Sequence, residues 1–96
     1  MIFGLDFDGT YTMDPPLWDM FIAEARKSGH EVIIVTMRYE DTEAAPVLYF
    51  KLHEKANRII YTNRKAKKSF VRMQKQAIHV WIDDQPEWLF EDAIVK

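Results

Sequence analysis

Two aspartates follow the first apolar segment of the chain at a spacing that can do chemistry. The run Ile2–Leu5 indicates a buried strand, and Asp6 and Asp8 come directly after it. In an extended chain, residues at this spacing lie on one side, and burying two like charges is costly unless a cation lies between them. Gly9 then permits a sharp turn. The pair indicates carboxylate chemistry around a cation; an acidic turn that merely ends a strand is the plain alternative.

A second acidic pair, Asp83 and Asp84, follows another apolar run near the end of the sequence, and Thr36 ends a third run, Val32–Val35. Together with backbone and water oxygens, carboxylates suit octahedral Mg²⁺. Ligand sites of parallel α/β sheets lie beyond the carboxyl ends of the strands. Asp6, Thr36 and Asp83 all fall at such predicted ends, which favours one shared site.

The order of these motifs resembles the signature of haloacid dehalogenase (HAD) superfamily phosphatases. The matching stretches are Asp6–Thr10, Thr36 and Ile82–Asp84, so the resemblance spans nearly the whole chain. Each motif alone is weak, but the combination in this order is specific. The resemblance implies a Rossmann-like three-layer α/β/α fold and a Mg²⁺-dependent phosphatase that hydrolyses a phosphomonoester through an aspartyl-phosphate.

By this resemblance, Asp6 is the nucleophile that attacks phosphorus, and Asp8 is the general acid and base. An acid at the second position marks the phosphatase and phosphotransferase branches of the family. Thr36 hydrogen-bonds the phosphoryl group. Asp6, the backbone carbonyl of Asp8, and Asp83 bind Mg²⁺ directly, and Asp84 supports these ligands without binding the ion itself. The ion would screen the attack of a carboxylate on an anionic phosphate.

The family also uses a lysine that neutralises the phosphoryl oxygens, and this sequence offers several cations. The candidates are Arg64, Lys65, Lys67, Lys68, Arg72 and Lys75. The family places this lysine near the start of the helix before the last strand, which favours Lys67, with Lys68 and Lys65 behind it. Lys67 and Lys68 differ by about 100° around a helix, so only one can face inward. The predicted buried stripe of this helix, which borders Lys67, comprises Ala66, Phe70 and Met73.

Four residues are assigned to substrate binding: Gly9, Thr10, Arg38 and Lys68. Arg38 lies two positions after Thr36 and can bind a substrate phosphate in a bidentate manner. A solvated loop arginine is an equally open interpretation of Arg38.

Apolar periodicity predicts alternating strands and helices. Strands are expected at 2–5, 31–36, 58–62 and 78–83, and helices at 15–28, 46–55 and 65–76, with a short helix after Pro86. Asp14 is expected to cap the first helix, Gly29 to end it, and 37–45 to form a polar loop. Alternation of this kind implies right-handed crossovers and a mainly parallel sheet. The family places the first strand centrally, which implies the order 3-2-1-4.

The chain is short for a HAD protein, and residues 1–96 are expected to form one domain without a cap. Only six residues separate Thr10 from Leu17, too few for a cap that would exclude water. An open site suits a phosphate on a large substrate, such as a nucleotide or a nucleic-acid end, or closure by a second subunit in a homo-oligomer. The segment 55–82 contains eight Lys or Arg and no Asp or Glu, which fits a nucleic-acid end loosely.

Composition excludes few classes of protein. The net charge of −2 predicts no partner, and the absence of cysteine excludes a disulfide framework. No apolar run approaches ~18 residues, which argues against a membrane span, and the first residues lack the basic region of a signal peptide. A cytoplasmic protein is the default expectation.

Two other classes are considered. A signalling receiver domain also combines acidic residues, Mg²⁺, a threonine and a lysine, but its acidic pair follows the first strand and its lysine comes last, whereas here Asp83 and Asp84 close the motif order. A non-catalytic or phosphate-binding regulatory protein on the same fold stays open, because the cap is missing.

Overall fold

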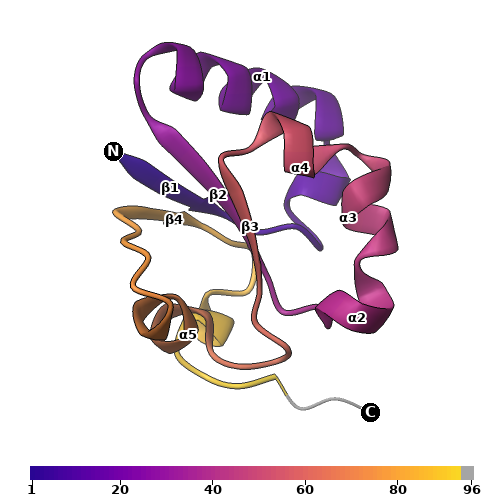
Figure 1. Cartoon of the computed structure of the whole chain (residues 1–96), viewed down its shortest axis with the longest axis vertical. Helices are drawn as coiled ribbons and strands as arrows, with labels where there is room; N and C mark the ends of the chain where they lie inside the picture. The colour runs from indigo at the N-terminus through magenta and orange to yellow at the C-terminus, as the bar shows by residue number, and fades with distance from the viewer. Residues whose placement is uncertain (94–96) are drawn as a thin grey trace.

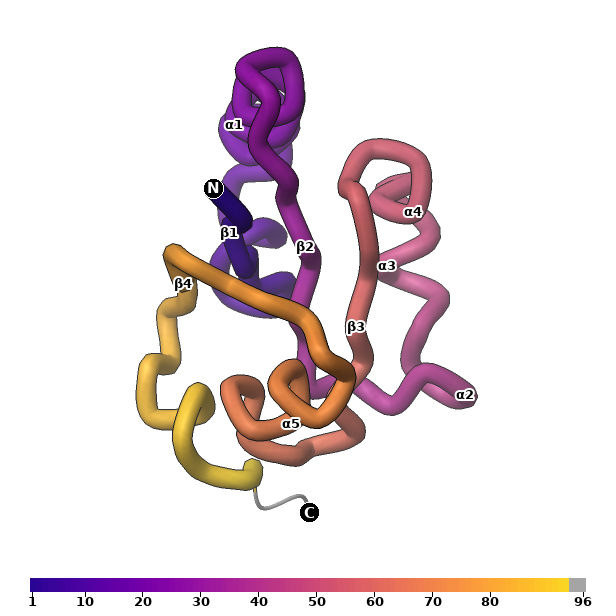
Figure 2. The backbone as a smooth tube through the Cα atoms, turned by 60° about the vertical axis from the view of Figure 1, so that its left-hand side comes forward, coloured from indigo at the N-terminus to yellow at the C-terminus, as the bar shows by residue number. Residues whose placement is uncertain are grey.

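A four-stranded parallel sheet forms the centre of the computed structural model, which describes residues 1–93. The strands are β1 (Ile2–Leu5), β2 (Glu31–Thr36), β3 (Arg58–Tyr61) and β4 (Val80–Ile82). They lie in the order β3-β2-β1-β4 (Figure 2), so the predicted α/β class and strand order are confirmed. The central strand β1 pairs in parallel with β2 on one side and β4 on the other.

Helices cover both faces of this sheet (Figure 1). The helices α1 (Pro15–Lys27), α3 (Ala45–Tyr49) and α4 (Leu52–Lys55) lie on one face, and α5 (Lys67–Met73) with the 3₁₀ turn η2 (Pro86–Leu89) lies on the other. Side chains alternate along a strand, so neighbouring residues of β2 enter different cores. Val32 and Ile34 belong to the α1 side, and Ile33 and Val35 to the α5 side. The uninterrupted apolar run of β2 follows from this burial on both faces.

The predicted boundaries of the first helix are confirmed. Asp14 caps α1 by accepting a hydrogen bond from the Leu17 backbone N–H at 3.4 Å, with prolines in the first turn. Gly29 follows the end of α1 at a φ of +88°, a conformation that glycine adopts without strain.

The predicted helix at 46–55 is wrong, because the segment is broken. Residue Lys51 adopts a left-handed φ of +58° and separates α3 from α4. A further short helix, α2 (Glu40–Glu43), lies where a polar loop was expected. Another short element, the 3₁₀ turn η1 (Tyr11–Met13), precedes α1.

The helix before β4 is shorter than predicted, running from Lys67 to Met73 instead of 65–76. Ala66 is extended, with φ −53° and ψ 129°, so the helix begins only at Lys67. Lys75 has a positive φ of 57°, so the helix does not continue to 76. The predicted buried stripe is wrong at Met73, which is 80% exposed, whereas Val71 is buried. None of the helices within residues 1–93 is long and apolar enough to cross a membrane.

Candidate active site

Three carboxylates meet where β1 and β4 end. Leu5 of β1 pairs with Ile82 of β4, so the residues that follow each strand emerge at the same edge of the sheet. The Asp6 backbone N–H donates to the Ile82 carbonyl at 3.0 Å and continues this register. Asp6, Asp83 and Asp84 each place one carboxylate oxygen within 4.8 Å of the others.

A buried ammonium lies against two of these carboxylates. Lys67 Nζ donates to Asp6 Oδ1 and to Asp83 Oδ2, each at 2.6 Å, and its side chain is only 1% exposed. It is the first residue of α5, which brings it to the carboxyl edge of the sheet. The other three candidate lysines lie elsewhere: Lys68 Nζ lies 5.0 Å from the centre of the Phe90 ring, and Lys65 and Lys75 are exposed.

The cluster carries more negative than positive charge, since three carboxylates face one ammonium. Burial raises the pKa of the Asp6 carboxyl to about 7, although Lys67 acts in the opposite direction. The pKa of Asp84 is lowered, first by a hydrogen bond from the Asp6 carboxyl and then by one from Thr10. The remaining negative charge is balanced by a proton or by a cation.

The donor set fits Mg²⁺, because it offers hard oxygen ligands and excess negative charge. Asp6, Asp83 and Asp84 are the residues that would hold the ion, and the first two of them also contact Lys67. The Asp8 carboxylate does not belong to this group. The resemblance to HAD phosphatases implies a metal contact from the backbone carbonyl of Asp8, not from its side chain.

Thr10 and Gly9 shape the acidic cluster from the turn after β1. The Thr10 hydroxyl lies 3.0 Å from Asp6 Oδ2 and 3.1 Å from Asp84 Oδ1, and it accepts a hydrogen bond from the Asp84 backbone N–H at 3.2 Å. Gly9 has a φ of +84°, and a Cβ added there would lie 2.4 Å from Asp84 Oδ2. A side chain at position 9 would therefore be both strained and obstructed.

Asp6 and Asp8 do not lie on one side of an extended segment as expected. Residues 7–10 form a turn, which leaves Asp6 buried and the Asp8 side chain 53% exposed. Asp8 instead forms a bidentate ion pair with Arg38: Nη2 donates to Asp8 Oδ1 at 2.8 Å and Nε to Oδ2 at 2.9 Å. The hydrogen bonds that Arg38 donates to Asp8 raise the pKa of Arg38 above its usual value.

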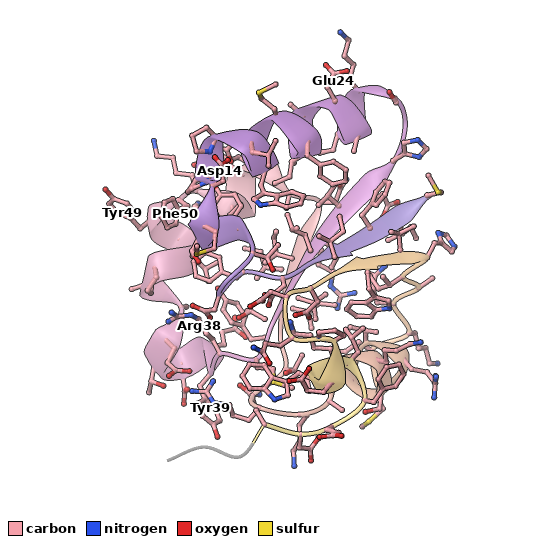
Figure 3. All side chains as sticks on the ribbon, turned by 180° about the vertical axis from the view of Figure 1, so that it is seen from behind. Asp14, Glu24, Arg38, Tyr39, Tyr49 and Phe50 are labelled. Atoms are coloured by element: carbon pink, nitrogen blue, oxygen red, sulfur yellow. The ribbon has the colours of Figure 1, made fainter. Side chains whose placement is uncertain are left out.

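Thr36 and Arg38 lie at the neighbouring strand end. Thr36 is the last residue of β2 and is buried, and its hydroxyl accepts a hydrogen bond from the Arg38 backbone N–H at 3.3 Å. The Arg38 side chain lies beside α2 (Figure 3), where Nη1 donates to the Glu43 carbonyl oxygen at 3.2 Å. The structure therefore brings Asp8, Thr36 and Arg38 to the same edge as the acidic cluster.

A second arginine, Arg64, supports this edge; the sequence indicated it only as one of the candidates for the phosphoryl-neutralising cation. Arg64 donates from Nη2 to Glu43 Oε2 at 2.9 Å and from Nη1 to the Met37 carbonyl at 2.6 Å, and it lies 4.8 Å from the centre of the Tyr39 ring. The Arg64 hydrogen bond is the main reason that the pKa of Glu43 is lowered. Nothing in the local sequence around Glu43 indicates this contact, because the partner is 21 positions away.

An open hollow of about 400 Å³ adjoins the acidic cluster. Its lining combines Asp83 and Asp84 with apolar side chains from η1 and α1, namely Met13, Leu17 and Trp18. Met13 is 76% exposed and Leu17 is 49% exposed. Leu17 and Trp18 fall within the helix expected at 15–28, and nothing in its periodicity indicated a site residue, so this part of the site was missed.

Comparisons with known proteins return no match: no family model matches the chain, and neither a curated protein nor a solved structure does. Assignment of a family therefore depends on the motifs, and assignment of a reaction depends on the residues of the site.

Proposed function

We propose that this protein is a Mg²⁺-dependent phosphatase of the HAD type, which hydrolyses a phosphomonoester through an aspartyl-phosphate on Asp6. The observation that supports this most is the position of Lys67, whose buried Nζ lies 2.6 Å from both Asp6 and Asp83. A structural ion pair needs one carboxylate, whereas here Asp84 adds a third at the ligand-binding edge of the sheet.

In the proposed reaction Asp6 is the nucleophile and Asp8 transfers the protons. A carboxylate oxygen of Asp6 attacks phosphorus as the bond to the leaving oxygen breaks, and Asp8 gives that oxygen a proton. In the second step Asp8 takes a proton from water, the water oxygen attacks phosphorus, and the Asp6 carboxylate leaves. Lys67 fixes the position of Asp6 and offsets its charge throughout.

Mg²⁺ held by Asp6, Asp83 and Asp84, with the Asp8 carbonyl by resemblance, would supply charge neutralisation between the attacking carboxylate and the phosphate. Thr36 and Arg38 are the proposed phosphoryl-binding groups on the β2 side. Gly9 and Thr10 support this site from the turn after β1.

An open edge admits a phosphate attached to a large molecule. The hollow beside Asp83 and Asp84 is open, and η1 and α1 follow β1 without an inserted domain. A nucleotide or a phosphorylated nucleic-acid end is the proposed kind of substrate, and Lys68 beside Phe90 would contact only its more distant parts. Closure of the site by a second subunit is the alternative.

One observation favours a second candidate, a phosphate-binding regulatory protein without turnover. Asp8, the proposed acid and base, is held by Arg38 through two hydrogen bonds. A carboxylate in such a pair is not available for proton transfer.

Turnover of a generic aryl phosphate, with and without Mg²⁺, separates the two candidates. We expect hydrolysis that requires Mg²⁺ and is lost in Asp6→Asn, because the amide is nearly the same size but a far poorer nucleophile. Asp41→Asn, which alters an exposed residue of α2, is the matched control and should keep turnover. Phosphate binding without hydrolysis of aryl, sugar, nucleotide or nucleic-acid phosphates would favour the regulatory protein.

A further inference from the structure

The guanidinium of Arg38 is anchored independently of Asp8. Nη1 donates to the Glu43 carbonyl at 3.2 Å, and the guanidinium carbon lies 5.4 Å from the centre of the Phe7 ring. The side-chain carboxylate of Glu43 does not compete for Arg38, because it pairs with Arg64. Arg38 can therefore keep its place when the Asp8 carboxylate leaves.

In the described part of the chain the Asp8 side chain, in contrast, is held only through Arg38. Among the side-chain contacts of residues 1–93, the Asp8 carboxylate takes part in the two hydrogen bonds to Arg38 and in no other. Its side chain is 53% exposed, so water can solvate the carboxylate as soon as the pair opens. Exposed ion pairs of this kind contribute little to stability, and opening this one requires no repacking.

Arg38 presents a phosphate-shaped pair of donors to Asp8. The Nε and Nη2 groups, which now hold the two Asp8 oxygens at 2.9 and 2.8 Å, are the fork with which arginine binds phosphate in a bidentate manner. Three of its five N–H groups are engaged by described residues. The adjacent Thr36 hydroxyl lies on the same edge.

We propose that the ion pair between Arg38 and Asp8 is a latch that the substrate opens: the phosphate takes the Nε and Nη2 donors of Arg38 and releases the Asp8 carboxylate. This inference rests on the proposed phosphatase function and adds to it a substrate-dependent control of Asp8. Asp8 is engaged while the site is empty of phosphate and becomes available for proton transfer when phosphate is bound. With the latch, the ion pair between Asp8 and Arg38 no longer argues against Asp8 as the acid and base, because bound phosphate releases it.

Binding of inorganic phosphate, measured by titration calorimetry at saturating Mg²⁺, tests the latch through a double-mutant cycle. The cycle compares the unaltered protein with Asp8→Asn, Arg38→Ala and the double variant. Loss of the competing carboxylate should make Asp8→Asn bind phosphate tighter, by up to about fivefold, because an exposed pair contributes at most about 1 kcal/mol. Arg38→Ala should bind about tenfold weaker or worse, and Arg38→Lys, which keeps the charge without the fork, should fall between.

The double variant separates competition from simple repulsion. If Asp8 weakens phosphate binding only through its charge, Asp8→Asn should give the same gain with or without Arg38. The latch predicts that the gain disappears in the Arg38→Ala background. An equal gain in both backgrounds, or weaker binding by Asp8→Asn, would overturn the latch while leaving the phosphatase proposal intact.

Absence of phosphate binding in all four proteins, each shown to be folded by circular dichroism, would overturn the latch and the proposed function together. If Arg38→Ala does not fold, Arg38→Lys replaces it in the cycle; the latch then predicts a smaller Asp8→Asn gain in the Arg38→Lys background than in the unaltered protein, and an equal gain would overturn it.

Discussion

Lys67 and Arg38 both pair with aspartates that follow β1, but the first pair is buried and the second reaches solvent. The Lys67 side chain is 1% exposed and that of Asp6 is 8%, against 24% for Arg38 and 53% for Asp8. Removing one partner of a buried pair leaves an uncompensated charge and costs about 3–5 kcal/mol. An exposed pair contributes about 0–1 kcal/mol. The first pair therefore fixes geometry, and the second can exchange partners.

The two aspartates differ because the chain turns between them. The turn at 7–10 buries Asp6 against Lys67 and leaves Asp8 at the rim beside Arg38. In the proposed reaction these are the properties that each role needs: a nucleophile held in place, and a proton carrier that must move between bound and available states.

Loss of Lys67 should have the largest effect, because it breaks the buried pair. Lys67→Ala leaves Asp6 and Asp83 without their shared cation, so turnover at saturating substrate should fall by about 10²-fold or more and the free energy of unfolding by about 3–5 kcal/mol. Lys68→Ala, which alters the neighbouring residue beside Phe90, should change both little. Near-normal turnover in Lys67→Ala, with a large loss in Lys68→Ala or Lys65→Ala, would show that the wrong lysine was chosen.

Gly9→Ala should have the next largest effect, since it perturbs the buried cluster from its rim. The substitution combines strain at a φ of +84° with a contact of 2.4 Å to Asp84 Oδ2. Strain alone costs about 1–3 kcal/mol. The matched control is Gly29→Ala, where φ is +88° and nothing lies within 4 Å of the added Cβ. Urea denaturation should show Gly9→Ala to be clearly the less stable of the two; equal losses would mean that Asp84 moves aside without cost.

Much of the sheet and of the acidic site could be predicted from the sequence, and the parts that could not have physical reasons. The apolar run of β2 and the aspartates after β1 and β4 indicated a parallel sheet with its site at one edge, because strand ends in such a sheet converge. Lys67 was chosen from its place at the start of the last long helix. The supporting argument failed at Met73, which is exposed, because the helix begins only after the extended Ala66 and ends before the left-handed Lys75, so that Val71 and not Met73 is buried.

The parts that could not be predicted depend on non-local contacts. The break at Lys51 has no glycine to mark it, so the broken helix at 46–55 was not foreseen. The pair between Arg38 and Asp8 joins residues 30 positions apart, and it forms only because the turn at 7–10 directs Asp8 toward the end of β2. Sequence spacing alone placed Asp8 beside Asp6.

Mg²⁺ should stabilise the protein through the buried cluster and not through the exposed pair. At ten times its dissociation constant a ligand contributes about 1.4 kcal/mol, which should raise the melting temperature by several degrees for a domain of this size. Asp83→Asn should diminish the response, and Arg38→Ala should keep it. Identical melting temperatures with and without millimolar Mg²⁺ would count against the metal site. If Arg38→Ala lost the stabilisation by Mg²⁺, the exposed pair would contribute to metal binding as the buried pair does, and the proposed difference between the two pairs would be wrong.

The central claim is that Asp6 carries the phosphoryl group, and the most direct test is to trap it there. Borohydride reduces an aspartyl-phosphate to homoserine, which peptide mass spectrometry can locate in the chain. During turnover of an aryl phosphate with Mg²⁺, we expect homoserine at position 6, absent without substrate and absent in Asp6→Asn. Turnover with homoserine at another aspartate, or with none at position 6, would contradict the account.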